Sequence, residues 1–181
     1  MDEDIILINQ FVGGEERGFE MLVKKYQNRA LNIVYSVVGN DRDSEDILQE
    51  VFMKVYNSLR SFKQDAQFST WLYRITVNTT YDFLRRRRHL VALEDIPQVN
   101  LVADNSQDSL HIKDRDYQIR KALESIPFKY RTAVVLKDIE GLSYQEIARV
   151  LGCSIGTVES RIFRARQLLK ERLLHLEGEI R

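Results

Sequence analysis

Asp46, Gln49 and Glu50 bring two carboxylates and an amide together in this chain of 181 residues. Their i, i+3 and i+4 spacing places them on one face of a helix, while Ile47 and Val51 turn to the other side. Paired carboxylates can perform acid–base catalysis. However, no metal-ligand spacing, phosphate loop or nucleophile elbow accompanies them in the sequence. We therefore expect a binding strip and no enzyme activity; taken alone, the triplet is more typical of a solvated helix face.

Aromatic and basic side chains alternate over residues 62–88. Aromatic rings can stack on unpaired bases and arginines can hold phosphates, which is the combination that a single-strand binder needs. The alternative is that most of these rings are core, and we accept it for Trp71 and Phe83. The polar loop Lys63 to Ser69, with Asn78, offers better base contacts. The full set is Phe62, Phe68, Trp71, Tyr73, Arg74, Tyr81, Phe83 and Arg85 to Arg88.

Residues 144–164 have the pattern of a helix-turn-helix. Ser143-Tyr-Gln-Glu146 is a capping box at the start of the first helix, and Gly152 suits the turn between the two helices. The second helix exposes a polar and basic face that fits the major groove of DNA. The alternative is an ordinary helical hairpin with a solvated basic face. The groove-facing set is Thr157, Ser160, Arg161 and Arg164.

Composition limits the class of protein. The 27 basic and 27 acidic residues cancel, but the charge is segregated into local patches, so nucleic-acid binding is compatible with a neutral sum. Cys153 is the single cysteine and the three histidines are scattered, so we expect no disulfide, no metal and no cofactor. The acidic start and the absence of a long apolar run predict a cytoplasmic chain with no signal peptide and no membrane insertion.

The elements that must position these groups are predicted to be helices. Apolar residues recur with helical spacing over about residues 19–38 and 41–59, and a third helix is expected from Ser69. The pattern is lost over residues 89–108, which indicates a linker, and returns from Ile112. We predict an all-α chain of two small helical domains joined by a flexible linker.

Four segments of the sequence together resemble the signature segments of extracytoplasmic-function sigma factors of bacterial RNA polymerase. Their order and spacing match over nearly the whole chain, which is more specific than any one segment. By this resemblance, residues 1–88 form sigma domain two, residues 89–111 a linker and residues 112–181 sigma domain four. The segments are DILQEVF at 46–52, FSTWLYRITVN at 68–78, GLSYQEIA at 141–148 and GTVESRIFRAR at 156–166.

The resemblance implies partners and residue roles. Core RNA polymerase would be held through its clamp coiled coil and its flap, with Asp46, Gln49 and Glu50 on the coiled coil. The minus-ten element of the promoter would be recognised and melted by Phe62, Lys63, Phe68, Ser69, Arg74 and Asn78. The minus-thirty-five element would be read by Thr157, Ser160, Arg161, Phe163 and Arg164. No small-molecule substrate is implied. Control by an anti-sigma factor is implied, and a membrane-bound anti-sigma factor would hold the chain near the membrane.

Glu159 departs from the family pattern, because relatives often carry a basic residue at this position of the recognition helix. The promoter sequence therefore does not transfer to this chain. Two other classes are alternatives for this sequence: a helix-turn-helix regulator whose first half dimerises or senses, and a helical enzyme that uses its carboxylates. The strip around Asp46 to Glu50 separates the first of these from a sigma factor, because only a sigma factor needs it to bind polymerase.

Overall fold

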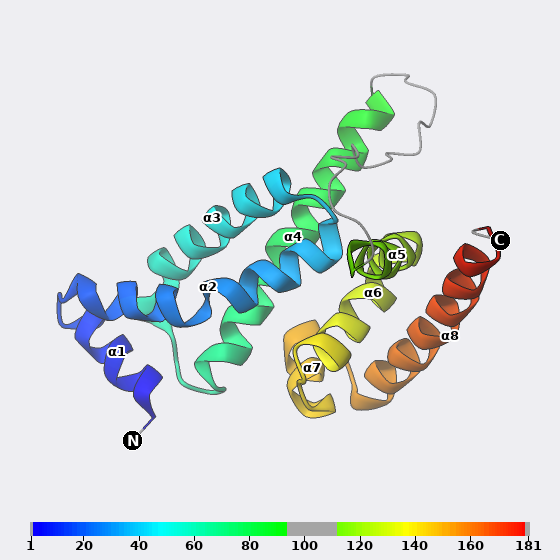
Figure 1. Cartoon of the computed structure of the whole chain (residues 1–181). Helices are drawn as coiled ribbons and strands as arrows, with labels where there is room; N and C mark the ends of the chain where they lie inside the picture. Colours follow the sequence, from blue (N-terminus) through cyan, green and yellow to red (C-terminus); the bar gives the residue numbers. More distant parts are fainter. Residues whose placement is uncertain (1, 94–111, 180–181) are drawn as a thin grey trace.

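The computed structural model describes residues 2–93 and 112–179, and it contains no strand in these ranges (Figure 1). The predicted all-α class is therefore confirmed. Residues 2–93 are called the first half below, and residues 112–179 the second half. The helices are α1 (Glu3–Val12), α2 (Glu16–Val38), α3 (Asp41–Ser58), the 3-10 turn η1 (Leu59–Ser61), α4 (Phe68–Leu93), α5 (Ile112–Ser125), α6 (Phe128–Val134), the π-helical turn η2 (Val135–Ile139), α7 (Tyr144–Leu151) and α8 (Ile155–Glu179).

Helix α1 was not predicted, because the helical spacing of apolar residues was identified only from residue 19 onward. The Asp2 side chain caps α1 by accepting a hydrogen bond from the backbone N–H of Asp4. Phe11 is 1% exposed and its ring lies 5.6 Å from that of Phe19 and 5.1 Å from that of Tyr56. These edge and tilted contacts fix α1 across α2 and the end of α3.

Asp4 is a buried acid, 6% exposed, and its partners explain why it is tolerated. Its carboxylate accepts hydrogen bonds from the Tyr26 hydroxyl at 2.5 Å and from the Lys25 ammonium at 2.7 Å. Burial, and then the hydrogen bond to Asp4, raise the pKa of Tyr26. The acidic N-terminus is therefore part of the first half's packing, held by two neighbouring residues of α2.

Helix α4 differs from the prediction at both ends. It begins at Phe68, one residue before the expected start, and it continues to Leu93, five residues beyond the expected end of domain two. Residues 89–93 contain neither glycine nor proline, so nothing in the local sequence ends the helix there. The rest of the predicted flexible linker, residues 94–111, lies outside the described residues.

The second half is built around α8. Its apolar stripe, Val158, Ile162 and Ala165, is almost fully buried beneath α5, α6 and α7. The Arg166 guanidinium makes two hydrogen bonds to the Asp138 carboxylate, at 2.6 and 3.0 Å, and ties α8 to η2. This bidentate pair fixes the turn that leads into α7.

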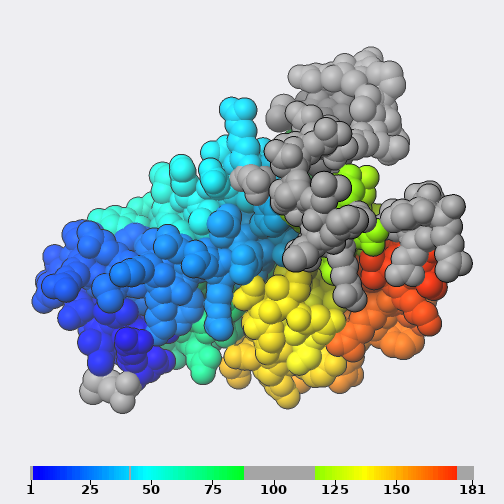
Figure 2. Space-filling view, viewed as in Figure 1, coloured from blue at the N-terminus to red at the C-terminus, as the bar shows by residue number. Residues whose placement is uncertain are grey.

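The two predicted helical domains pack against each other. Helix α7 lies on α4, and α5, α6 and η2 contact α2. One buried cluster contains Leu72 and Val77 from the first half together with Leu136 and Ile147 from the second. In Figure 2 the blue surface of the first half meets the yellow surface of the second half with no opening between them. The halves therefore share a hydrophobic core in this conformation.

We predict that Tyr26→Phe lowers the free energy of unfolding by about 2 kcal/mol, because it removes a hydrogen bond to a buried carboxylate. Urea denaturation followed by circular dichroism measures the change. Asp4→Asn keeps an acceptor for Tyr26 and removes only the charge, so it should cost less than Tyr26→Phe combined with Lys25→Met. An unchanged midpoint in Tyr26→Phe would show that the Asp4 cluster does not stabilise the fold.

Candidate nucleic-acid interfaces and docking surface

The docking strip, defined as Asp46, Gln49 and Glu50, lies on the outer side of α3. Ile47 and Val51 are at most 1% exposed and pack into the first half. Asp46 and Gln49 are exposed and Glu50 is half-buried. Figure 1 shows α3 on the side of the first half that faces away from α5 to α8. The spacing argument therefore predicted the orientation of all three side chains, and the second half does not cover them.

Glu50 already has two basic partners within the chain. Its carboxylate lies 2.8 Å from the Lys54 ammonium, one turn along α3, and 3.1 Å from the Arg86 guanidinium of α4. The hydrogen bonds from Lys54 and then Arg86 lower the pKa of Glu50, although partial burial opposes them. Glu50 is thus a carboxylate held ionised and available to an incoming cation, which would have to replace one of these partners.

The arginine run at the end of α4 is also paired. Arg87 lies 2.5 Å from Asp43, and Arg85 lies 3.4 Å from Asp82. With the Arg86–Glu50 pair, three of the four arginines contact acids of α3 or α4. The sequence predicts that these arginines hold phosphates. In each pair at least the arginine is well exposed to solvent, so each pair is weak and can be exchanged for a phosphate at low cost.

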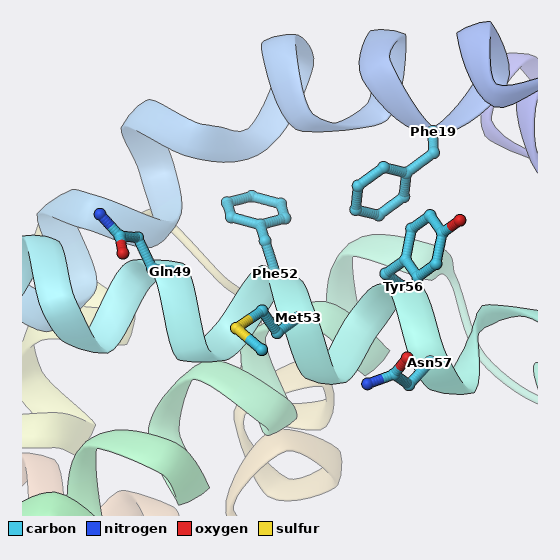
Figure 3. A pocket seen from close by; sticks show the side chains of 6 residues that line it. All are labelled: Phe19, Gln49, Phe52, Met53, Tyr56 and Asn57. Carbon is cyan, nitrogen blue, oxygen red and sulfur yellow. The ribbon is translucent and has the colours of Figure 1, made fainter.

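An apolar pocket of about 510 Å³ adjoins the docking strip (Figure 3). Figure 3 shows the Phe52 ring turned toward Phe19 of α2, with Met53 beside it on α3. Met53 is 67% exposed. This pocket was not predicted from the sequence, although Gln49, Met53 and Tyr56 follow one another at helical spacing. The lining residues are Phe19, Gln49, Phe52, Met53, Tyr56 and Asn57.

Phe68 was predicted to contact DNA, and the structure corrects this. Its side chain is 1% exposed, and its ring packs against those of Tyr26 at 5.4 Å and Trp71 at 5.8 Å. Phe62 is half-buried, with its ring 5.1 Å from that of Trp71, so one side of it faces solvent. The helical spacing of aromatic residues in the sequence cannot distinguish a buried ring from an exposed one. Phe68 is a packing residue that supports Phe62.

Lys63 follows Phe62 in the chain, Ser69 lies at the start of α4, and Arg74 and Asn78 lie one turn apart farther along α4. Lys63, Arg74 and Asn78 are exposed, and Ser69 is half-buried. Tyr81, 49% exposed, extends the row at i+7 from Arg74. We call Arg74, Asn78 and Tyr81 the outer face of α4. It combines a cation, an amide and a ring, which can contact phosphates, base edges and base faces respectively.

The helix-turn-helix is present as predicted. Ser143 accepts from the backbone N–H of Glu146 at 3.2 Å, and Glu146 accepts from that of Ser143 at 2.8 Å, which completes the capping box. Gly152 ends α7 at φ +61°, a left-handed conformation that glycine adopts without strain. The Ser154 hydroxyl accepts from the backbone N–H of Thr157 and begins α8. Local sequence therefore fixes the angle at which α8 is presented.

The exposed side of α8 carries the residues predicted to read DNA. Ser160, Phe163 and Arg164 are exposed, with Phe163 at 62%, while Thr157 and Arg161 are half-buried at the edge of the same face. Within the described residues, no cluster of three or more histidine, cysteine or acidic side chains could hold a metal, and no helix is long and apolar enough to span a bilayer.

Comparison with known proteins assigns both halves to one class. The family model for Sigma-70 region 2 matches residues 22–90, and that for Sigma-70, region 4, matches residues 116–169. These are the halves that carry the docking strip and the helix-turn-helix. The fold and the two surfaces therefore define a sigma factor of the sigma-70 class.

Similarity over the full length narrows the class. The chain is 35% identical to the ECF RNA polymerase sigma-E factor of Haemophilus influenzae, covering 94% of this chain and 95% of the relative. It is 33% identical to the RNA polymerase sigma-H factor of Pseudomonas aeruginosa, covering 98% and 97%. The chain belongs to the family of extracytoplasmic-function sigma factors of RNA polymerase. The prediction of a transcription initiation factor is thereby confirmed at the level of the family.

Two solved structures are similar over most of the chain. CnrH, in complex with the cytosolic domain of CnrY, superposes with a TM-score of 0.72 at 29% identity, covering 95% of this chain and 97% of that one. The sigma factor RpoE from Bartonella quintana, in complex with the anti-sigma factor NepR, gives a TM-score of 0.70 at 28% identity, covering 86% and 96%.

We predict that Ser143→Ala lowers the free energy of unfolding by about 1 kcal/mol, because the capping box loses its hydroxyl. Hydrogen bonds from the Ser143 hydroxyl and then its N–H lower the pKa of Glu146 below the unfolded value of about 4.3. A depressed pKa adds stability above that value, and the gain is lost as the pH falls through the folded pKa. The effect of Ser143→Ala should therefore shrink in acid. Gln145→Ala, in the same turn, is the control and should show no such pH dependence in urea titrations.

Proposed function

We propose that this sigma factor binds the clamp coiled coil of core RNA polymerase through Asp46, Gln49 and Glu50. The observation that carries the proposal is the position of these groups: exposed or half-buried on the outer side of α3, beside an apolar pocket, and away from the second half. A strip of acceptors beside an apolar hollow suits a helical partner that offers cations and one apolar side chain. The second half would meet the polymerase flap.

The first half would capture the minus-ten element during opening. Phe62 would stack on a base that has left the duplex, and Lys63, Ser69, Arg74 and Asn78 would contact the neighbouring backbone and base edges. Tyr81 adds a second exposed ring along the same path. Phe68 would act only by supporting Phe62 from beneath, since it is buried. Opening then needs no catalysis, because trapping bases as they unstack prevents them from pairing again.

The second half would read the minus-thirty-five element with α8. Arg161 and Arg164 would contact guanine edges or phosphates, Ser160 and Thr157 would contact bases or backbone at the start of the helix, and Phe163 would contact thymine methyl groups. Thus residues 1–88 would bind the minus-ten element and residues 112–181 would bind the minus-thirty-five element. Modest affinities at the two elements and at the polymerase add through linkage.

An anti-sigma factor is the proposed regulator of this cytoplasmic protein. The similar RpoE was solved with the anti-sigma factor NepR, and the similar CnrH with the cytosolic domain of CnrY. The similarity extends across both halves in each case, so a protein partner that holds the halves together would fit this chain. The exposed Phe163 ring of α8 and the pocket on α3 are apolar surfaces that such a partner can cover.

Charge reversal tests the docking strip. We expect Asp46→Lys and Glu50→Lys to weaken the binding of core polymerase by about tenfold or more, a change of about 1.4 kcal/mol or greater, because each sets a cation against the cations of the partner. Fluorescence anisotropy of the labelled chain titrated with core enzyme measures this. Glu20→Lys, which reverses an exposed acid of α2 outside the strip, is the matched control. If core affinity survived in both strip variants while DNA binding was unaffected, a conventional helix-turn-helix regulator would be the better description.

Arg164→Ala tests the recognition helix. Loss of one arginine contact to a base edge should weaken holoenzyme binding by about 1–3 kcal/mol at promoters with an intact minus-thirty-five element. The same variant should show little change at promoters whose minus-thirty-five element has been scrambled. Promoters selected from genomic DNA by the reconstituted holoenzyme supply the templates. Arg172→Ala, which removes an exposed cation farther along α8, is the control, and an equal loss in both variants would indicate only general attraction to phosphate.

A further inference from the structure

One acidic side chain lies on the exposed side of α8 that the proposed function assigns to DNA. Glu159 is exposed, and it is the single acid within residues 155–164. It is the fifth residue of α8 and lies one turn before Phe163, which the proposed function places on thymine methyl groups. The N-terminal residues of a recognition helix are the ones that reach base edges in the major groove. Glu159 therefore lies in the part of α8 that reads bases.

The contacts of Glu159 within the protein do not explain a glutamate at this position. The side chains three and four positions away on its helix are Ile155, Gly156, Ile162 and Phe163, and none of them carries a charge. Glu159 forms no ion pair with another described residue. An acid is attracted to the positive end of a helix only within the first turn, and Glu159 lies in the second.

The two edges of this face of α8 differ in charge. Arg161 and Arg164 lie on the edge away from Glu159, about 140 to 160° around the helix axis at about 100° per residue. On the edge of Glu159, the next cation is Arg166, two turns along the helix, and its guanidinium donates two hydrogen bonds to Asp138 at 2.6 and 3.0 Å. Phosphates are attracted to the first edge and repelled by the carboxylate on the second. The DNA groups that suit Glu159 are therefore base edges.

The surface of α8 beside Glu159 is open. Gly156 lies three positions earlier on the same side of the helix, and a Cβ added to it would meet no other part of the protein within 4 Å. Glycine is a poor helix former, so neither packing nor helix stability requires it here. The missing side chain does let DNA approach the helix closely. Close approach is what a carboxylate needs in order to accept a hydrogen bond directly from a base.

The chemistry of the carboxylate limits the bases that it can contact. An ionised carboxylate only accepts hydrogen bonds. In the major groove, cytosine presents its N4 amino group alone, adenine presents an amino group beside the N7 acceptor, and guanine and thymine present acceptors without a donor. Cytosine is therefore the base that gives the carboxylate a donor without also setting an acceptor against it.

We propose that Glu159 is a specificity-determining residue that selects a cytosine in the minus-thirty-five element by accepting a hydrogen bond from its N4 amino group. Gly156 allows the close approach that this contact needs. The proposal rests on the proposed function, in which α8 reads this element. One helix turn advances about 5.4 Å and one base pair about 3.4 Å, so the cytosine lies within about two base pairs of the thymine contacted by Phe163.

Selection of promoters by reconstituted holoenzyme from a library with a randomised minus-thirty-five element tests this role. The wild-type chain should enrich cytosine at one position, with about tenfold tighter binding than for the other bases there. Glu159→Ala should lose the preference at that position only. Glu159→Gln should shift it toward adenine and Glu159→Arg toward guanine, because amide and guanidinium groups pair with those bases. Circular dichroism should show native helicity in all three variants, since the side chain is exposed.

Glu171→Ala is the matched control, because it removes another exposed acid farther along α8. It should leave the preference at every position unchanged. If Glu159→Ala instead raised the affinity for all sequences equally, Glu159 would only repel phosphates and the proposal would be overturned. A wild-type preference for a base other than cytosine at the position that the Glu159 variants change would also overturn it.

Gly156→Ala tests the close approach separately. The added methyl group points into open space and alanine favours helices, so the melting temperature should stay the same or rise. Binding to the selected promoter should nevertheless weaken several-fold, because the methyl group keeps DNA away from α8. Unchanged binding would overturn the part of the proposal that concerns Gly156.

Failure of the proposed function would look different from failure of this inference. If the wild-type holoenzyme selected no minus-thirty-five sequence, or if Arg164→Ala left the selected sequence and the affinity unchanged, α8 would not be the reader of the element. A clear selected sequence that is identical for the wild-type chain and for all three Glu159 variants would overturn the role of Glu159 alone.

Discussion

Six side chains of α4 form a buried arc that is packed by α2 and α3 on one side and by α7 on the other: Leu72, Tyr73, Thr76, Val77, Thr79 and Thr80. Half of them are threonines, whose hydroxyls must be satisfied where water is excluded. Thr76 and Thr80 donate to carbonyls four residues earlier in their own helix, and Thr79 accepts from Lys54 of α3. A helix of modest hydrophobicity can therefore serve as the central element of both halves. Within residues 72–81, the exposed side chains that remain for DNA are Arg74, Asn78 and Tyr81.

Features that depend on neighbours along the chain were predictable from the sequence. The amphipathic faces of α2 and α3, the capping box at Ser143 and the turn at Gly152 follow from spacing and from backbone preferences within one or two turns. Features that depend on distant residues were not. Helix α1 is held through Asp4 by Tyr26 and Lys25, more than 20 positions away. Phe68 is a core residue because Tyr26 and Trp71 enclose it, which no period along α4 could show.

The candidate sites likewise combine features set by neighbouring residues, which were predictable, with features set by distant residues, which were not. The direction of Asp46, Gln49 and Glu50 was set by helix geometry, but the pairing of Glu50 with Arg86 joins positions 36 residues apart and changes what both groups can do. The sequence predicts that the arginine run binds phosphates. In the free chain, Arg86 and Arg87 of this run instead form ion pairs with acids of α3. Exposed pairs of this kind contribute little to stability. A cationic partner on Glu50 would release Arg86, so polymerase binding at α3 can increase the positive charge available to DNA along α4.

The ion pairs of α4 occupy basic side chains that the proposed function assigns to DNA. Arg86 is held by Glu50 and Arg87 by Asp43 until a partner replaces one member of each pair. The docking strip stays exposed or half-buried on the outer side of α3, so a partner can reach Glu50 without moving the second half. In the proposed function, binding of polymerase at α3 would therefore come before the release of Arg86 toward DNA.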